Sequence, residues 1–294
     1  MKVIDNKITF SFDGSNSYVE KVKDNETVVF ITRDCFNDQL TEEGTTIGTL
    51  DWNCINPATG PVYVEGATTN DTLKVEILKI ELGDTGVMCA LPGAGLLGPK
   101  VKEESIKRIK VKDGKVYFND DITFDVTPMV GVIGVAPKEG SISNGSPGVH
   151  GGNMDNKRIK EGATVYFPIF HEGALFSLGD IHAAMGDGEI MVSGVEINAK
   201  VTVKISVLKD VQIETPIVEN DEIIGVVYSD KEIEKAIYNA VDITNEIVSD
   251  KLGISYNEAG MLLSAVGDVQ ICQVVNPEKT VMMSVPKSIL KSVI

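Results

Sequence analysis

Histidine is scarce in this chain of 294 residues: there are three, and all fall between His150 and His182. Long apolar runs are missing too. The longest candidate, residues 126–137, is broken by proline and glycine, and a membrane helix needs about 18 apolar residues or more. The N-terminus lacks the apolar core of a secretory signal peptide. We therefore expect a cytoplasmic protein.

Basic residues are also few, with 27 Lys and Arg against 43 Asp and Glu, which gives a net charge of −16. Such a chain is repelled by nucleic acid and by anionic membranes, so we expect a small-molecule substrate and neither of those partners. The four cysteines are widely spaced and form no C-x-x-C pair. We expect them to be reduced thiols.

Familiar catalytic and nucleotide motifs are absent or unsupported. There is no G-x-S-x-G nucleophile elbow. Gly93-x-Gly95-x-x-Gly98 matches the dinucleotide-binding string, but Pro92 and Pro99 flank it and a basic stretch follows. We interpret this segment as an apolar loop that could wall a substrate pocket.

Short strands dominate the first two thirds of the sequence. Alternating or β-branched runs predict strands at residues 26–32, 61–67, 72–80, 164–170, 189–197 and 200–208. Residues 110–118 predict a hairpin around Asp113-Gly114. Strands this short and frequent favour a mainly β fold built from sandwich or barrel units.

The pattern changes after about residue 215. Ser229 and Ser255 each open a capping-box pattern ahead of an apolar run, and Gly253 suits a helix end. Residues 269–275 and 280–285 resemble strands. We therefore expect a β-rich portion, 1–215, carrying a metal site, and a C-terminal α+β portion, 216–294, packed against it.

The histidines lie among carboxylates and glycines. Asp180-x-His182 is a period-two pair, and Asp187-x-Glu189 repeats that spacing after Gly186. On a strand, both members of such a pair point to one face. A strand, a tight acidic turn and a second strand would bring the four side chains together.

A second histidine segment precedes this one. His150 follows a Pro-Gly turn and is followed by Gly151 and Gly152, which let the backbone approach a ligand closely. Asn153 and Asp155 add polar atoms. His171 precedes a separate Glu-Gly turn, and we do not expect it to be a ligand.

Histidine and carboxylate side chains hold divalent transition metals. Zn²⁺ takes about three protein ligands and leaves a position for water, whose proton a nearby carboxylate can accept. We predict His150, Asp180 and His182 as ligands, with Glu189 or Glu65 as the base. A non-catalytic β protein stabilised by Zn²⁺ or Ca²⁺ is the alternative, because acidic residues are abundant.

Three segments resemble the acetamidase/formamidase family of metal-dependent amide hydrolases. They are G-P-V-Y-V-E-G-A (60–67), P-G-V-H-G-G-N-M-D-N-K (147–157) and G-A-L-F-S-L-G-D-I-H-A-A-M-G-D-G-E (173–189). The resemblance implies a mostly β enzyme that cleaves short aliphatic amides to a carboxylic acid and ammonia. The Ser-Ser-Lys amidases differ, because their serine-rich signature is absent here. Another small amide or a urea-like substrate on the same scaffold stays open.

Carried onto this sequence, the resemblance marks polar positions in a site: Asp34, Glu65, His150, Asn153, Asp155, Asp180, His182, Asp187 and Glu189. Asp34 follows a strand-like run and is predicted as a fourth ligand or as a ligand of a second ion. Glu65 is predicted as a half-buried acid that carries protons. Asn153 and Gly152 are predicted to contact substrate. We expect Zn²⁺, a second ion such as Ca²⁺, and a homodimer.

Overall fold

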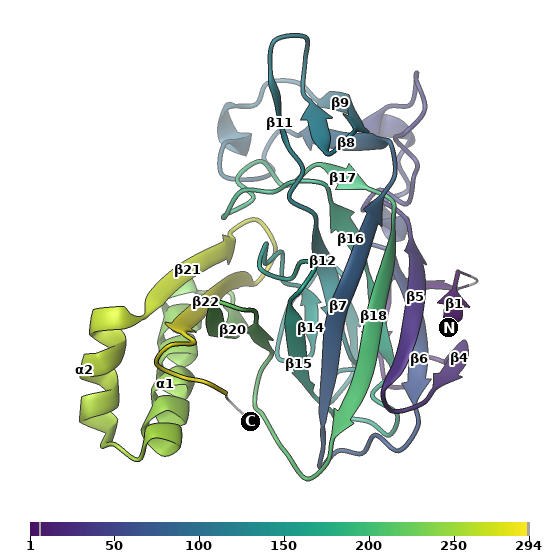
Figure 1. Cartoon of the computed structure of the whole chain (residues 1–294). Coiled ribbons are helices and arrows are strands. Elements are labelled where there is room, and N and C mark those ends of the chain that lie inside the picture. Colours follow the sequence, from purple (N-terminus) through teal and green to yellow (C-terminus); the bar gives the residue numbers. More distant parts are fainter. Residues whose placement is uncertain (6, 293–294) are drawn as a thin grey trace.

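The computed structural model describes residues 1–5 and 7–292 and is built mainly from two large sheets (Figure 1). The first sheet has nine strands. In spatial order these are β1 (Lys2–Ile4), β5 (Glu26–Thr32), β18 (Ala199–Leu208), β7 (Thr72–Leu82), β15 (Thr164–Pro168), β19 (Ile217–Glu219), β20 (Ile223–Asp230), β22 (Lys279–Pro286) and β21 (Asp268–Gln273).

The second sheet has eleven strands, eight of them along one path. This path runs β11 (Thr123–Asp125), β10 (Lys115–Tyr117), β9 (Ser105–Lys112), β8 (Thr85–Ala90), β17 (Glu196–Ile197), β16 (Phe176–His182), β12 (Met129–Gly134) and β14 (Gly151–Asn153). β6 (Ala58–Val64) pairs with β16 and carries β2 (Ile8–Thr9) and β4 (Glu20–Val22). A separate pair joins β3 (Ser11–Asp13) to β13 (Ser141–Ser143).

The main core lies between the two sheets. Alternate residues of β18 are buried, and they join one apolar cluster with residues of β5, β7, β6, β12 and β16. The rings of Phe30 on β5 and Phe176 on β16 meet edge to face at 5.7 Å. The mainly β fold and its sandwich-like packing therefore agree with the sequence-based expectation.

The C-terminal portion adds two helices, α1 (Ile233–Leu252) and α2 (Tyr256–Val266), and α1 lies against β20 and β22 (Figure 1). Gly253 ends α1 with φ 63° and Ser255 forms a capping box with Glu258, as predicted. The box predicted at Ser229 is wrong. Ser229 is still in β20, where its hydroxyl meets that of Thr280 at 2.9 Å.

The two portions share a sheet, because β19 pairs with β15 on one side and β20 on the other. The helices nevertheless have their own apolar cluster, which includes Ala236, Ala240 and Val248. A division near residue 215 stays a prediction. Neither helix in the described part of the chain is long and apolar enough to span a membrane.

Local predictions near the site had mixed outcomes. The hairpin around Asp113-Gly114 is confirmed by the antiparallel β9–β10 pair. The strand predicted at 189–197 is wrong over most of its length, because only Glu196–Ile197 pair as β17. Glu189 has φ 47°, a left-handed conformation that a strand does not accept. All four cysteines are free, as expected.

Candidate active site and metal centre

A cavity of about 300 Å³ opens between the end of β16, the segment that follows β5, and the loops at 189–192 and 275–277. Its polar lining includes Cys35, Asn153, Asp180, Glu189, Glu196 and Asn276. Its apolar lining includes Phe36, Trp52, Ile55, Leu91, Val192 and Val275. A concave site with a few convergent polar groups is the usual form of a small-molecule site.

The end of β16 carries Asp180, which lines this cavity, and His182, and both are buried. Neighbouring β12 presents Gly131 beside them. A Cβ added at Gly131 would lie 2.6 Å from Asp155 Oδ1 and 2.9 Å from Asp180 Oδ2. The two carboxylates therefore occupy the space that a side chain on β12 would take.

Six buried side chains form two adjacent groups of potential metal ligands: Cys35, Asp180 and Glu196, and Asp155, His182 and Glu189. Within each group the ligand atoms lie within 4.8 Å of one another. Ligands of one ion lie at most about two bond lengths apart, ~4.2 Å for Zn²⁺ with N and O ligands and ~5 Å for Ca²⁺. Small side-chain movements would suffice to close either group on an ion.

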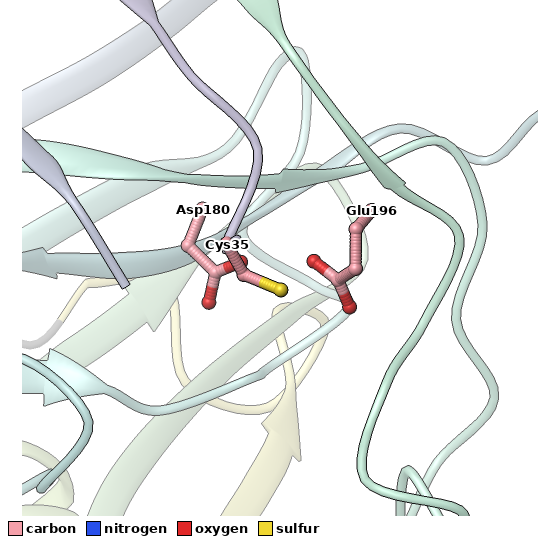
Figure 2. A group of neighbouring side chains, drawn as sticks. All are labelled: Cys35, Asp180 and Glu196. Carbon is pink, nitrogen blue, oxygen red and sulfur yellow. The ribbon is translucent and has the colours of Figure 1, made fainter. Parts of the chain in front are cut away.

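Nε2 of His182 links the two groups. It lies 3.1 Å from Glu196 Oε2, 3.4 Å from Asp180 Oδ1 and 3.8 Å from Asp155 Oδ1. His182 and Glu196 face each other as a cross-strand pair of β16 and β17. In Figure 2 the Glu196 carboxylate points toward the sulfur of Cys35, which comes from the segment after β5.

The facing oxygens lack ordinary partners. Asp155 Oδ1, Asp180 Oδ1 and Glu196 Oε2 are buried and accept no well-aligned hydrogen bond, although His182 Nε2 lies within 4.0 Å of all three. Asp155 Oδ2 does accept one, from Asn276 Nδ2 at 2.8 Å. Buried carboxylate oxygens without a donor are costly, and a cation would satisfy all three. These residues therefore fit a divalent metal.

The backbone supports the same interpretation. Asp155, Asp180 and Glu189 have φ values of 43°, 55° and 47°, which non-glycine residues adopt rarely. Each such conformation costs on the order of 1–3 kcal/mol and persists where the surrounding structure imposes it, commonly at functional sites. Three of the six candidate ligands share this feature.

Burial and mutual repulsion raise the pKa values of three of these carboxyls when no cation is bound. Burial and the charge of Asp180 raise the pKa of Glu196 to about 8, although His182 opposes them. Burial and Asp180 also raise the pKa of Asp155 to about 6. Burial and Asp155 raise the pKa of Glu189 well above its usual range. A bound cation would reverse this by favouring the ionised forms.

His182 and Cys35 respond to the same surroundings. Burial alone lowers the pKa of His182, but the charges of Glu196 and Asp180 outweigh it and raise that pKa well above its usual value. Burial, followed by Glu196 and Asp180, raises the pKa of the Cys35 thiol well above its usual value. Cys35 is therefore a neutral thiol here and fits a ligand that ionises on metal binding better than a free nucleophile.

The structure brings together part of the set predicted from sequence. Asp180, His182, Glu189 and Asp155 meet, and Asn153 lines the same cavity with Oδ1 lacking a hydrogen-bond partner. Gly152 lies in β14, where a Cβ would come within 2.5 Å of the carbonyl oxygen of Ser146, a residue of the cavity lining.

Other predicted residues belong to neither ligand group. His150 packs edge to face on Phe12 at 5.2 Å, and burial lowers its pKa to about 4. Within the described residues, no carboxylate lies within 4.0 Å of its imidazole. Asp187 is drawn away by ion pairs with Lys157 and Arg158. His171 Nε2 meets the carbonyl of Pro137 at 2.8 Å, outside both groups.

Asp34 and Glu65 also lie outside both ligand groups. Asp34 is buried next to Cys35, and burial raises its pKa to about 7; its Oδ1 accepts a hydrogen bond from the Asp38 amide at 2.7 Å. It belongs to neither ligand group. The expected half-burial of Glu65 is wrong. This residue is exposed in the turn after β6, because the strand ends at Val64.

Sequence reasoning missed Glu196, Cys35 and Asn276. Glu196 stands between Val195 and Ile197, so an acid inside an apolar strand was a usable signal. Cys35 had only its position after Asp34 to mark it. Asn276 carries no local signal, because its role depends on how the loop between β21 and β22 reaches the site.

The chain is similar to known amidases over almost its whole length. The sequence profile of the acetamidase/formamidase family matches residues 15–145 and 142–291. An acetamidase structure from Bacillus halodurans is 40% identical, covers 99% of both chains and has a TM-score of 0.97. The crystal structure of a predicted acetamidase/formamidase from Thermoanaerobacter tengcongensis is 43% identical in sequence. The match covers 99% of this chain and 97% of that one, also with a TM-score of 0.97.

Curated relatives match over shorter segments. A formamidase from Methylophilus methylotrophus is 40% identical over 65 residues, which make up 22% of this chain and 16% of that protein.

Proposed function

Since this chain belongs to the acetamidase/formamidase family, we propose that it is a metal-dependent hydrolase of small linear amides. The reaction adds water across the C–N bond of R-CO-NH₂ and yields a carboxylate and ammonium. The observation that carries the proposal is the pair of buried ligand groups beside the cavity, with three carboxylate oxygens that accept no well-aligned hydrogen bond.

We propose Zn²⁺ as the metal. Each group contains one donor that suits zinc better than calcium, the Cys35 thiol or the His182 imidazole. Ca²⁺ takes six to eight oxygen ligands, so the nitrogen and sulfur donors of the two groups suit it less well than Zn²⁺. When bound, the metal supplies Lewis-acid activation of water and of the amide carbonyl.

The remaining chemistry falls to residues of the chain. Glu189 lines the cavity, so its carboxylate would accept a proton from the attacking water and pass it to the departing amine. Asn153 Oδ1 is buried without a partner at the same wall and would accept an N–H of the substrate amide. Exposed Glu65 does not line the cavity, and we assign it no step.

The proposal is tested by ammonia release from formamide, acetamide and longer amides, with metal analysis of the same preparation. His182→Gln should lose at least about 100-fold in kcat/KM, together with bound metal. His171→Gln is the matched control, because that imidazole lies outside both groups, and it should keep both. Ammonia release that survives His182→Gln and chelation would contradict the metal mechanism.

We also propose a homodimer. Exposed Leu96 and Ile190 lie side by side, with the Leu96 amide donating to the Ile190 carbonyl at 2.8 Å, and Leu97 is exposed next to them. These side chains offer apolar surface that a second copy could cover. Molar mass in solution, measured by light scattering with and without Leu97→Lys, tests this assembly.

A further inference from the structure

The cavity is larger than the smallest amides require. Its volume is about 300 Å³, whereas one water molecule accounts for about 30 Å³ of liquid. On that scale formamide, with three heavy atoms, fills roughly a third of the space. Acetamide adds one more methyl group. Either substrate would leave most of the cavity to water.

The space beyond the ligand groups has an apolar wall. Phe36, Ile55, Leu91 and Val192 all line the cavity. They also belong to one hydrophobic cluster, or pack against it, together with buried side chains such as Leu40 and Val87. This wall is therefore anchored in packed structure. An apolar group that displaced water from it would gain binding energy.

The backbone conformation of Val192 is unfavourable for a β-branched residue, so the surrounding structure must impose it. It has φ 74°, and a β-branched residue in that region is a genuine outlier. Its amide donates to the carbonyl of Glu189 at 2.9 Å, which ties the wall to a candidate ligand. Backbone strain of this kind is concentrated at ligand-binding and active sites.

On the basis of the amide hydrolysis proposed above, we infer that the preferred substrates are primary amides with an apolar acyl chain or ring of about four carbons or more. The carboxamide would lie at the ligand groups and Asn153, and the acyl group along Phe36, Ile55, Leu91 and Val192. Each methylene buried on this wall should raise kcat/KM about fourfold until the cavity is full.

The test compares kcat/KM for formamide, acetamide, butanamide, hexanamide and benzamide. The wild type should favour the longer amides by about tenfold or more over acetamide. Ile55→Trp fills the cavity and should remove this preference, so that kcat/KM for hexanamide no longer exceeds that for acetamide. Ile122→Trp makes the same substitution at an exposed residue outside the cavity lining and should leave the preference intact.

The results distinguish failure of the inferred size preference from failure of the proposed function. Highest kcat/KM for formamide or acetamide, or an unchanged preference in folded Ile55→Trp, would overturn the inference and leave the proposed amidase standing. Failure to cleave any amide would overturn the proposed function instead. In that case calorimetry can still compare the affinities of hexanamide and acetamide. Hexanamide that binds no more tightly than acetamide, or not at all, would overturn the inferred preference for longer acyl groups.

Discussion

His182 and Glu196 sit opposite each other on adjacent antiparallel strands, with Nε2 of the imidazole 3.1 Å from Oε2 of the carboxylate. The pair joins the two ligand groups, because His182 belongs to one and Glu196 to the other. Register between β16 and β17 thus determines whether the two ligand groups lie next to each other.

Glu196→Gln should lower bound metal and amidase activity together. The change removes an anionic ligand but keeps the size of the side chain, so we expect a loss of about 100-fold or more in kcat/KM with the fold retained. Metal content by mass spectrometry and ammonia release measure the two effects. Glu81→Gln, on an exposed strand residue, should match the wild type. Full activity in Glu196→Gln would show that this carboxylate is not a required metal ligand.

Gly131→Ala should displace the carboxylates without touching them chemically. The new Cβ would lie 2.6 Å from Asp155 Oδ1 and 2.9 Å from the backbone oxygen of Asp180. Overpacking of this kind costs about 1–3 kcal/mol of stability, and we expect metal affinity to fall at least about tenfold. Gly186→Ala is the control, because its Cβ would meet nothing within 4 Å. Equal metal affinity in the two variants would contradict the role given to Gly131.

His150→Ala separates the sequence-based ligand set from the structural one. The imidazole is buried against Phe12 and outside both ligand groups. We therefore expect bound metal to be unchanged while the free energy of unfolding falls by about 2–4 kcal/mol through the cavity that is left. Denaturant melts and metal analysis measure these quantities. Loss of the metal from folded His150→Ala would restore His150 as a ligand.

A pH-dependent contribution to stability is expected from Asp71, which lies away from the metal centre. Burial raises its pKa, but hydrogen bonds from Lys209, Asp210 and Thr68 outweigh burial and leave the pKa below its usual value. A carboxyl with a depressed folded pKa stabilises the fold above its unfolded pKa, near 3.9. That contribution is lost as the pH falls through the folded pKa.

Asp71→Asn should accordingly cost about 1–3 kcal/mol at pH 7, and the difference from wild type should shrink below about pH 4. Urea melts across this range measure it. Asp221→Asn, at an exposed loop position, should show no such pH-dependent difference. A constant difference down to pH 2 would mean that the charge of Asp71 is not what stabilises the fold.

The sequence predicts those parts of the structure whose signals are local. Alternation located most strands, and the Asp113-Gly114 turn and the Ser255 capping box were both correct. The Ser229 pattern failed because pairing with β22 extends β20 through the predicted cap. Tertiary pairing overrode a local signal there.

The same contrast between local signals and long-range pairing applies to the candidate site. Asp180 and His182 are close in sequence and end on one strand, so their spacing was informative. Asp187 and Glu189 have the same spacing, but Glu189 adopts a left-handed φ and Asp187 pairs with Arg158, so only Glu189 reaches the centre. Glu196 has a local signal as an acid between apolar residues, but its position next to Cys35 depends on long-range strand pairing.

Whether catalysis needs the metal is decided by ammonia release from chelator-treated protein as Zn²⁺ is added back, with bound metal determined in parallel. We predict that activity toward a primary amide rises with bound metal in the wild type and in His171→Gln. His182→Gln should recover neither at the same free Zn²⁺. Equal activity before and after metal removal would show that catalysis does not need the metal. Full recovery in His182→Gln would show that His182 is not a required ligand.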